Sequence, residues 1–112
     1  MEQSIEIKKK LANNWFFFLQ NEICKEFENL ERIVSKKYDK KFIKKVWCKT
    51  NKNEGGGTSY ILKNGNIFDK VGVNQSTVSG VFKKEFRSKI LGAQLDGNYW
   101  ASGVSVVAHM KN

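Results

Sequence analysis

The sequence has little of several residue types on which common functional sites are built. It contains one histidine, two cysteines and no proline in 112 residues. Cys24 and Cys48 are too few for a disulfide framework, and their spacing fits no zinc motif, so we expect two thiols in a reducing compartment. His109 alone does not make a metal site, because a protein-bound metal needs several ligands. A disulfide scaffold and a self-contained zinc site are therefore excluded.

Long apolar runs are also missing. The longest run covers residues 15–19, far short of the roughly 20 residues that a membrane-spanning helix needs. Lysines at positions 8–10 are not followed by an apolar stretch with a small-residue cleavage site, which a secretory signal requires. We therefore expect a cytoplasmic protein without a membrane span.

Arginine is scarce although the chain is strongly basic. The net charge is +9, and of the 20 cationic residues 18 are lysine, with arginine only at positions 32 and 87. Such a charge raises the local concentration of anions, whether nucleic acid, an acidic membrane or a polycarboxylate substrate. Aromatic residues within the lysine-rich segment 35–53 would allow stacking on single-stranded nucleic acid, but base readout favours arginine. The composition therefore argues against a nucleic-acid partner and favours a solvated basic surface.

Apolar periodicity predicts one long helix over residues 4–34. Apolar side chains recur there at three- and four-residue steps along the whole segment. Ser4 is placed to cap the start of the helix, and Asn13-Asn14 marks a point where the helix is expected to break. A helix of this length covers roughly 45 Å, so we expect it to lie across a sheet.

The rest of the chain predicts strands joined by turns. Aromatic and branched residues favour a strand near 42–49, and the glycine cluster at 54–59 is expected to be a flexible loop. Asn64-Gly65 between apolar runs predicts a hairpin in which both turn residues have positive φ. Residues 83–91 predict a short helix, and alternating residues predict a last strand over 98–110.

The predicted last strand has two unlike faces. One is typical of a core and carries Trp100, Ser102, Val104, Val106, Ala108 and Met110. The other has small residues in its middle, which leaves room for a ligand, and carries Tyr99, Ala101, Gly103, Ser105, Val107 and His109. Ser105 and His109 are not a nucleophile–base pair, because four strand residues separate them by roughly 13 Å and such a pair must hydrogen-bond near 3 Å. They line a face for a large ligand, mark two sub-sites, or are incidental polar residues of a strand.

A series of motifs in this order resembles the oxygen-dependent coproporphyrinogen III oxidases. The series comprises Trp47-Cys48-Lys49, a glycine-rich segment at 55–59, a hairpin at 61–65, FDKVGVNQSTVSG at 68–80 and SGVSVVAH at 102–109. The last two motifs are the most specific, and the resemblance covers residues 15–112. The chain departs from the family pattern at Lys49, Glu54, Asp69, Val71, Ser79 and Met110, which indicates a divergent member.

The resemblance implies an oxidoreductase of haem biosynthesis. Its reaction is the oxidative decarboxylation of two propionates of coproporphyrinogen III to vinyl groups, giving protoporphyrinogen IX. Molecular oxygen is the co-substrate, and no organic cofactor is implied. By the same resemblance Ser105 binds substrate and His109 is a ligand of a divalent metal.

The resemblance also implies the fold and its extent. We expect an α+β chain in which a long N-terminal helix packs on an antiparallel sheet. Residues 1–112 would form a single, incomplete domain, belonging to a larger helix-flanked antiparallel sheet in a homodimer. The family's proton-donating histidine, further metal ligands and carboxylate-binding arginines have no counterpart in this sequence. We therefore expect an N-terminal portion that has no catalytic residue and is inactive alone.

Two other functions remain as alternatives. The chain is alternatively a small basic module that binds anions or nucleic acid. It is otherwise a degenerate, non-catalytic remnant that persists by pairing through an open edge of its sheet.

Overall fold

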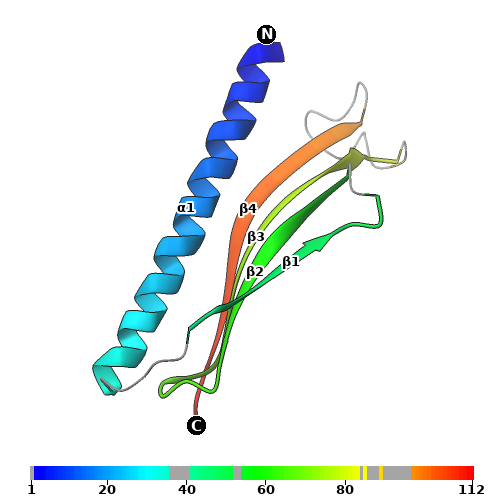
Figure 1. The fold of residues 1–112 in the computed structure, drawn as a ribbon. Coiled ribbons are helices and arrows are strands. Elements are labelled where there is room, and N and C mark those ends of the chain that lie inside the picture. The colour runs from blue at the N-terminus through cyan, green and yellow to red at the C-terminus, as the bar shows by residue number, and fades with distance from the viewer. Residues whose placement is uncertain (1, 36–40, 52–53, 84, 86–88, 90–96) are drawn as a thin grey trace.

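A computed structural model describes the chain except for residues 1, 36–40, 52–53, 84, 86–88 and 90–96 (Figure 1). The described residues form a helix, α1 (Glu2–Val34), and four strands, β1 (Ile43–Cys48), β2 (Gly55–Lys63), β3 (Phe68–Val81) and β4 (Asn98–Met110). The strands lie in the order β1-β2-β3-β4, each antiparallel to its neighbour. The helix lies along one side of this sheet, as predicted for an α+β chain.

Helix α1 is continuous through Asn13-Asn14, so the predicted break is wrong. The Asn13 side chain instead links the helix to the sheet, because its Oδ1 accepts hydrogen bonds from Thr77 Oγ1 at 2.9 Å and from Ser102 Oγ at 2.6 Å. The predicted cap at Ser4 is also wrong, since the helix already begins at Glu2.

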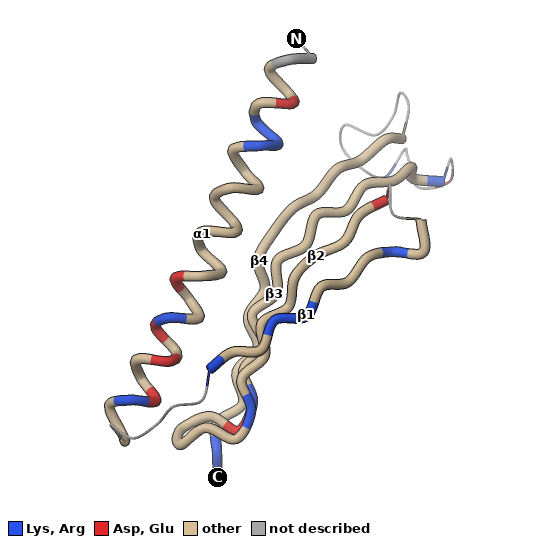
Figure 2. Tube along the Cα trace, in the orientation of Figure 1, with Lys and Arg blue, Asp and Glu red and all other residues tan. Residues whose placement is uncertain are grey.

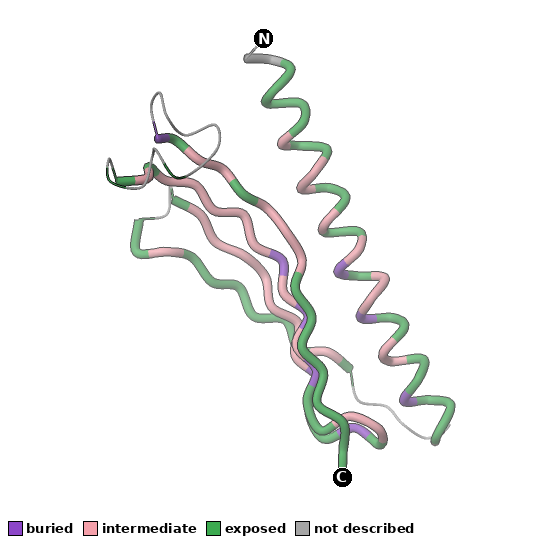
Figure 3. The backbone as a smooth tube through the Cα atoms, turned by 180° about the vertical axis from the view of Figure 1, so that it is seen from behind, coloured by how far each residue is buried: buried purple, intermediate pink, exposed green. Residues whose placement is uncertain are grey.

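A small core joins α1 to the sheet. Its buried apolar members are Cys24, Leu62, Val71 and Val73. Gln20 of α1 is buried among them, and its Nε2 donates to the backbone oxygens of Thr58 at 2.8 Å and of Val73 at 3.0 Å. This amide therefore fixes the helix against both β2 and β3. In Figure 3 the buried stretches of α1 and β3 face each other, while β1 is exposed along its length.

The molecule is elongated and leaves much apolar surface uncovered. Its radius of gyration is 17.9 Å, whereas a compact domain of this length has a radius of gyration of about 13 Å. Leu11, Trp15 and Phe18 of α1 are all more than half exposed. The described residues therefore bury only the central part of the interface between helix and sheet. No helix among the described residues is long and apolar enough to cross a membrane.

The predicted hairpin is confirmed, but its turn differs. Asn64 has φ of 57°, whereas Gly65 is not among the residues with positive φ. Gly65 is needed for space, because a Cβ there would lie 2.6 Å from Glu31 Oε1. The buried Glu31 carboxylate accepts backbone N–H groups from Asn66, Ile67 and Phe68. The end of α1 therefore holds the β2–β3 connection.

The predicted flexible loop at 54–59 is wrong, because Gly55 starts β2. A side chain at Gly56 would overlap the Trp47 backbone oxygen of β1, and one at Gly57 would overlap the Gln75 oxygen of β3. These glycines let three strands approach closely, which outweighs their weak intrinsic preference for strands. The predicted strands near 42–49 and at 98–110 are confirmed, while most of the predicted helix at 83–91 lies outside the described residues.

Candidate ligand-binding face

The face of the sheet that points away from α1, called the open face below, carries the predicted site residues. Val71 and Val73 of β3 are buried under the helix, and successive side chains of a strand point to opposite faces. The open face is therefore built from alternate residues of the strands, which include Ile61, Lys70, Gly72, Asn74, Gly103, Ser105, Val107 and His109.

The division of β4 into two faces is confirmed for the part of the strand that lies over α1. Ser102 hydrogen-bonds to Asn13 of the helix, and Val104 packs against the core. Val106 and Met110 were predicted to be core residues, but they are 42% and 71% exposed. At this end of the sheet α1 packs on β3, where Phe27 and Glu31 contact Phe68, and it leaves the neighbouring edge strand β4 exposed.

Each predicted site residue has a polar partner across the strand pair. Ser105 lies opposite Asn74, and His109 lies opposite Lys70. The two pairs are four residues apart along the strands, which corresponds to roughly 13 Å. The structure therefore brings Ser105 and His109 to one face but not within hydrogen-bonding distance of each other, so they do not act as a nucleophile–base dyad.

A shallow pocket lies between these two polar pairs. It has a volume of about 220 Å³, and its lining consists of Ile61, Lys70, Gly72, Asn74, Val107 and His109. Sites for drug-sized ligands typically have volumes of about 300–1,000 Å³, so this pocket fits one edge of a large ligand. A second hollow of about 160 Å³ adjoins it at Ile61 and adds Lys45 and Lys63.

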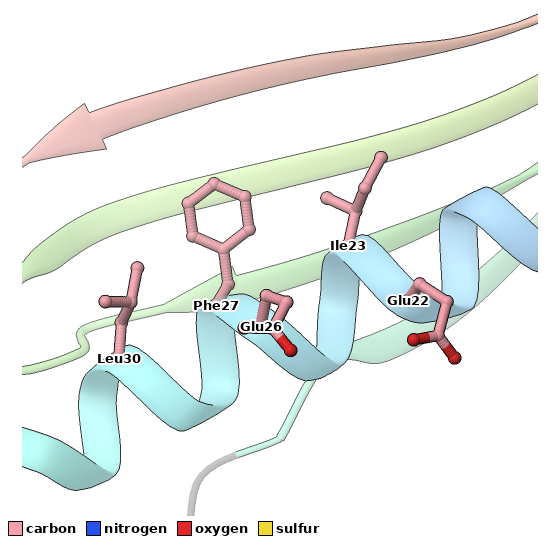
Figure 4. A pocket seen from close by; sticks show the side chains of 5 residues that line it. All are labelled: Glu22, Ile23, Glu26, Phe27 and Leu30. Atoms are coloured by element: carbon pink, nitrogen blue, oxygen red, sulfur yellow. The ribbon is translucent and has the colours of Figure 1, made fainter.

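A larger hollow of about 280 Å³ on α1 has an unsuitable lining. Its apolar residues, Ile23, Phe27 and Leu30, project from one side of the helix (Figure 4). Glu22 and Glu26 supply its charged groups. Two carboxylates repel an anionic ligand, and this hollow contains neither Ser105 nor His109. The open face carries both Ser105 and His109, and for that reason we place the candidate site there.

Charge is distributed unevenly between the helix and the sheet (Figure 2). Among the four strands Asp69 is the only acidic residue, whereas lysine occurs at positions 44, 45, 63 and 70. Six glutamates lie on α1. The positive potential that attracts anions is therefore concentrated on the strands.

The residues around His109 do not form a metal site by themselves. No group of three or more His, Cys, Asp or Glu side chains suited to a metal ion occurs in the described part of the chain. The residue opposite His109 is Lys70, and an ammonium group repels a metal cation. A divalent metal would thus need its other ligands from elsewhere, and no chemical step is assigned to a metal here.

The cysteines lie apart from the open face. Burial, and secondarily the charge of Glu28, raises the pKa of the Cys24 thiol to about 12. Cys24 is therefore a protonated thiol at neutral pH and a poor nucleophile. Cys48 is exposed at the end of β1, and both cysteines are free, as predicted.

Sequence reasoning missed Lys70, Gly72 and Asn74 as residues of the site. They lie within the motif at 68–80, which was interpreted as a family signature and not as a strand. The alternation of these residues with the buried Val71 and Val73 is a period-2 signal. That signal could have placed them on the side of their strand opposite to the core, but their position beside Ser105 follows only from the pairing of β3 with β4.

Comparison with known proteins identifies the family. The family model described as Coproporphyrinogen III oxidase matches residues 11–112. Oxygen-dependent coproporphyrinogen-III oxidases from Rickettsia felis and Rickettsia prowazekii are each 47% identical to this chain over 104 residues, which is 93% of the chain and 37% of each relative. The same-named protein of Rickettsia africae is 43% identical over the same shares. The chain thus spans just over a third of the length of these relatives, and it belongs to the coproporphyrinogen III oxidase family.

Proposed function

We propose that this chain supplies the substrate-binding sheet face of an oxygen-dependent coproporphyrinogen III oxidase. The observation that carries the proposal is the open face itself. It places the predicted site residues Ser105 and His109 in one row beside a pocket lined by Lys70. A cationic face with a floor of small residues suits a broad macrocycle that bears four carboxylates.

The residues of this chain bind and orient the substrate in this proposal. Ser105 donates its hydroxyl hydrogen to one polar group of the macrocycle, and His109 contacts the substrate or a metal at the far end of the row. The strands hold these side chains at a fixed separation, which orients the propionates for reaction. The strands contain one histidine and no arginine. We assign the proton transfers of the reaction to groups outside this chain, because the family's proton-donating histidine has no counterpart in its sequence.

In the full reaction each of two propionates loses carbon dioxide and a hydride equivalent to become a vinyl group, and molecular oxygen accepts the electrons and is reduced. We propose that residues 1–112 are one incomplete domain and that the chain alone is inactive. We also propose that the enzyme works as a homodimer in the cytoplasm. Support for an assembly comes from the exposed apolar side chains of α1, such as Leu11 and Trp15.

A reconstitution assay tests this function. The chain is co-expressed with the part of the Rickettsia felis relative that lies C-terminal to the matched region, and coproporphyrinogen III is supplied in air. Protoporphyrin is then measured by fluorescence after chromatography. We expect product from the pair, and none from this chain alone or from the complementing fragment alone.

The positive control is the matching 104-residue segment of the Rickettsia felis protein paired with the same complementing fragment. If that pair forms product while the pair with this chain does not, the proposed function is wrong. Turnover by this chain alone would instead contradict its assignment as an inactive portion.

A further inference from the structure

Two glycines of the open face have no structural reason to be glycine. A Cβ at Gly103 would meet nothing within 4 Å, and one at Gly72 would meet only Asn74 Nδ2, at 3.9 Å. Neither residue has positive φ. Glycine within a strand costs roughly 0.5–1 kcal/mol relative to alanine, and it is often found where a ligand approaches the backbone closely. These positions differ from Gly57, where a side chain would overlap the neighbouring strand.

Gly72 forms the floor of the pocket, and the polar side chains stand at its two ends. Val107 lies opposite Gly72 on β4, and Ile61 lies opposite it on β2, so the floor is flanked by two apolar side chains. Lys70 precedes Gly72 by two residues on the same face, and Asn74 follows it by two. This order of polar end, apolar floor and polar end matches a macrocycle with polar groups at its margins.

Lys70 is a cation without a partner in the described part of the chain. The ion pairs found there join Lys9 to Glu6 and Lys25 to Glu22, both on α1. The side chain across the strand pair is His109, which is not an anion. Lys70 is exposed at the end of the pocket and forms none of these ion pairs, so its ammonium group is available to an anionic ligand.

We propose that Lys70 is a further substrate-binding residue, which pairs with a carboxylate of the macrocycle as the ring lies on Gly72. This inference rests on the proposed function and adds to it the residue that recognises one propionate. The Asn74 side-chain N–H donates a hydrogen bond to a polar group at the opposite margin of the ring, beside Ser105. Gly72 lets the macrocycle approach the strand backbone, because any side chain there would hold the ring away from the floor.

The test uses coproporphyrin III, the oxidised tetracarboxylate porphyrin, which binds without turning over. Its binding to the 112-residue chain is followed by porphyrin fluorescence anisotropy at low salt. We expect Lys70→Gln to weaken binding about fivefold, the factor that corresponds to one exposed ion pair. Lys70→Arg should retain the affinity, because arginine keeps the charge.

Lys44→Gln is the matched control. Lys44 lies on β1 and is paired with Tyr60, which places it on the helix side of the sheet. This variant removes the same charge from an exposed strand residue on the opposite face, and we expect its affinity to change less than twofold. The tetramethyl ester of the same porphyrin, which has no carboxylate, should bind the wild type and Lys70→Gln equally.

Several outcomes overturn the inference. These are equal losses in Lys70→Gln and Lys44→Gln, a loss of ester binding equal to the loss of acid binding, or no porphyrin binding by a chain whose circular dichroism shows it folded. The reconstituted pair separates this failure from failure of the function. If the unvaried pair is active and Lys70→Gln leaves its KM unchanged, only the assignment of Lys70 is wrong. If the unvaried pair is inactive while its positive control is active, the function itself is wrong.

Discussion

Replacing Glu31 by alanine should destabilise the chain more than any exposed substitution. The Glu31 carboxylate is fully buried, and it accepts the N–H groups of Ile67 at 3.1 Å and of Phe68 at 3.0 Å, as well as that of Asn66. It lies in the last turn of α1, where the helix dipole disfavours a negative charge. Its value to the fold therefore comes from the β2–β3 connection and not from the helix.

The size of the effect follows from these bonds. A hydrogen bond to a charged group contributes about 1.5–3 kcal/mol. Asn66 is an exposed residue, so water can replace the carboxylate as the partner of its N–H group. Ile67 and Phe68 are half-buried, so their two bonds account for most of the loss. We expect Glu31→Ala to lower the free energy of unfolding by about 3–5 kcal/mol. The free energy of unfolding of a small domain is roughly 5–15 kcal/mol in total, so Glu31→Ala could unfold the chain. The milder Glu31→Gln, with an expected loss of about 1–2 kcal/mol, is therefore measured beside it.

Urea titration followed by circular dichroism measures these changes, with Glu26→Ala as the control. Glu26 is exposed on the same helix, so its replacement should change the free energy of unfolding by less than about 0.5 kcal/mol. Gly65→Ala should also destabilise the wild type, because its new Cβ displaces the carboxylate. In the Glu31→Ala background the same change should cost little, which gives a coupling of about 1–3 kcal/mol. Additive effects of the two changes, or a loss below about 1 kcal/mol in Glu31→Ala, would refute this reasoning.

Further predictions concern two buried side chains of α1, Cys24 and Gln20. At pH 8 iodoacetamide should label the exposed Cys48 while Cys24 stays unmodified in mass spectra, because a pKa raised from 9.0 to about 12 lowers the thiolate fraction about 1,000-fold. The Cys24 thiol ionises more readily in the unfolded chain, so its contribution to the free energy of unfolding is complete below pH 9 and should be lost between pH 9 and 12. Urea denaturation at a series of pH values measures this loss. A free energy of unfolding that stays constant over this range would contradict the burial of the thiol. Gln20→Met keeps the volume but removes two hydrogen bonds to the strands, so thermal and urea unfolding should show a loss of about 1–3 kcal/mol. An unchanged midpoint would mean that the amide does not fix the helix to the sheet.

The sequence predicted those elements whose residues carry a strong local pattern. The alternation of 98–110 located β4 and separated Ser105 from the helix side, and Asn64-Gly65 located the hairpin. The errors arose where contacts with residues far away in the sequence determine the local structure. Asn13 stays helical because Thr77 and Ser102 bond to its side chain. The glycines at 55–57 are strand residues because β1 and β3 pair with them.

Only those residues of the site that belong to a strong local pattern were predicted. Ser105 and His109 follow from the motif and from the alternation of one strand. Lys70 and Asn74 become site residues only when β3 is paired with β4 in a defined register. Pairing register depends on contacts between residues 31 and 39 positions apart, such as Asn74 with Ser105 and Lys70 with His109, and a single sequence gives no direct measure of it.

The central claim, that a polycarboxylate macrocycle lies against the open face, is tested most directly by filling the floor of the pocket. Gly72→Phe should fold as stably as the wild type, because a Cβ there meets no backbone and Phe favours strands. Ala108→Phe is the control, since Ala108 is exposed on the helix side of β4. The account predicts that Gly72→Phe weakens coproporphyrin III binding at least about tenfold, equivalent to about 1.4 kcal/mol, while Ala108→Phe binds like the wild type. Wild-type affinity in a folded Gly72→Phe variant would contradict it.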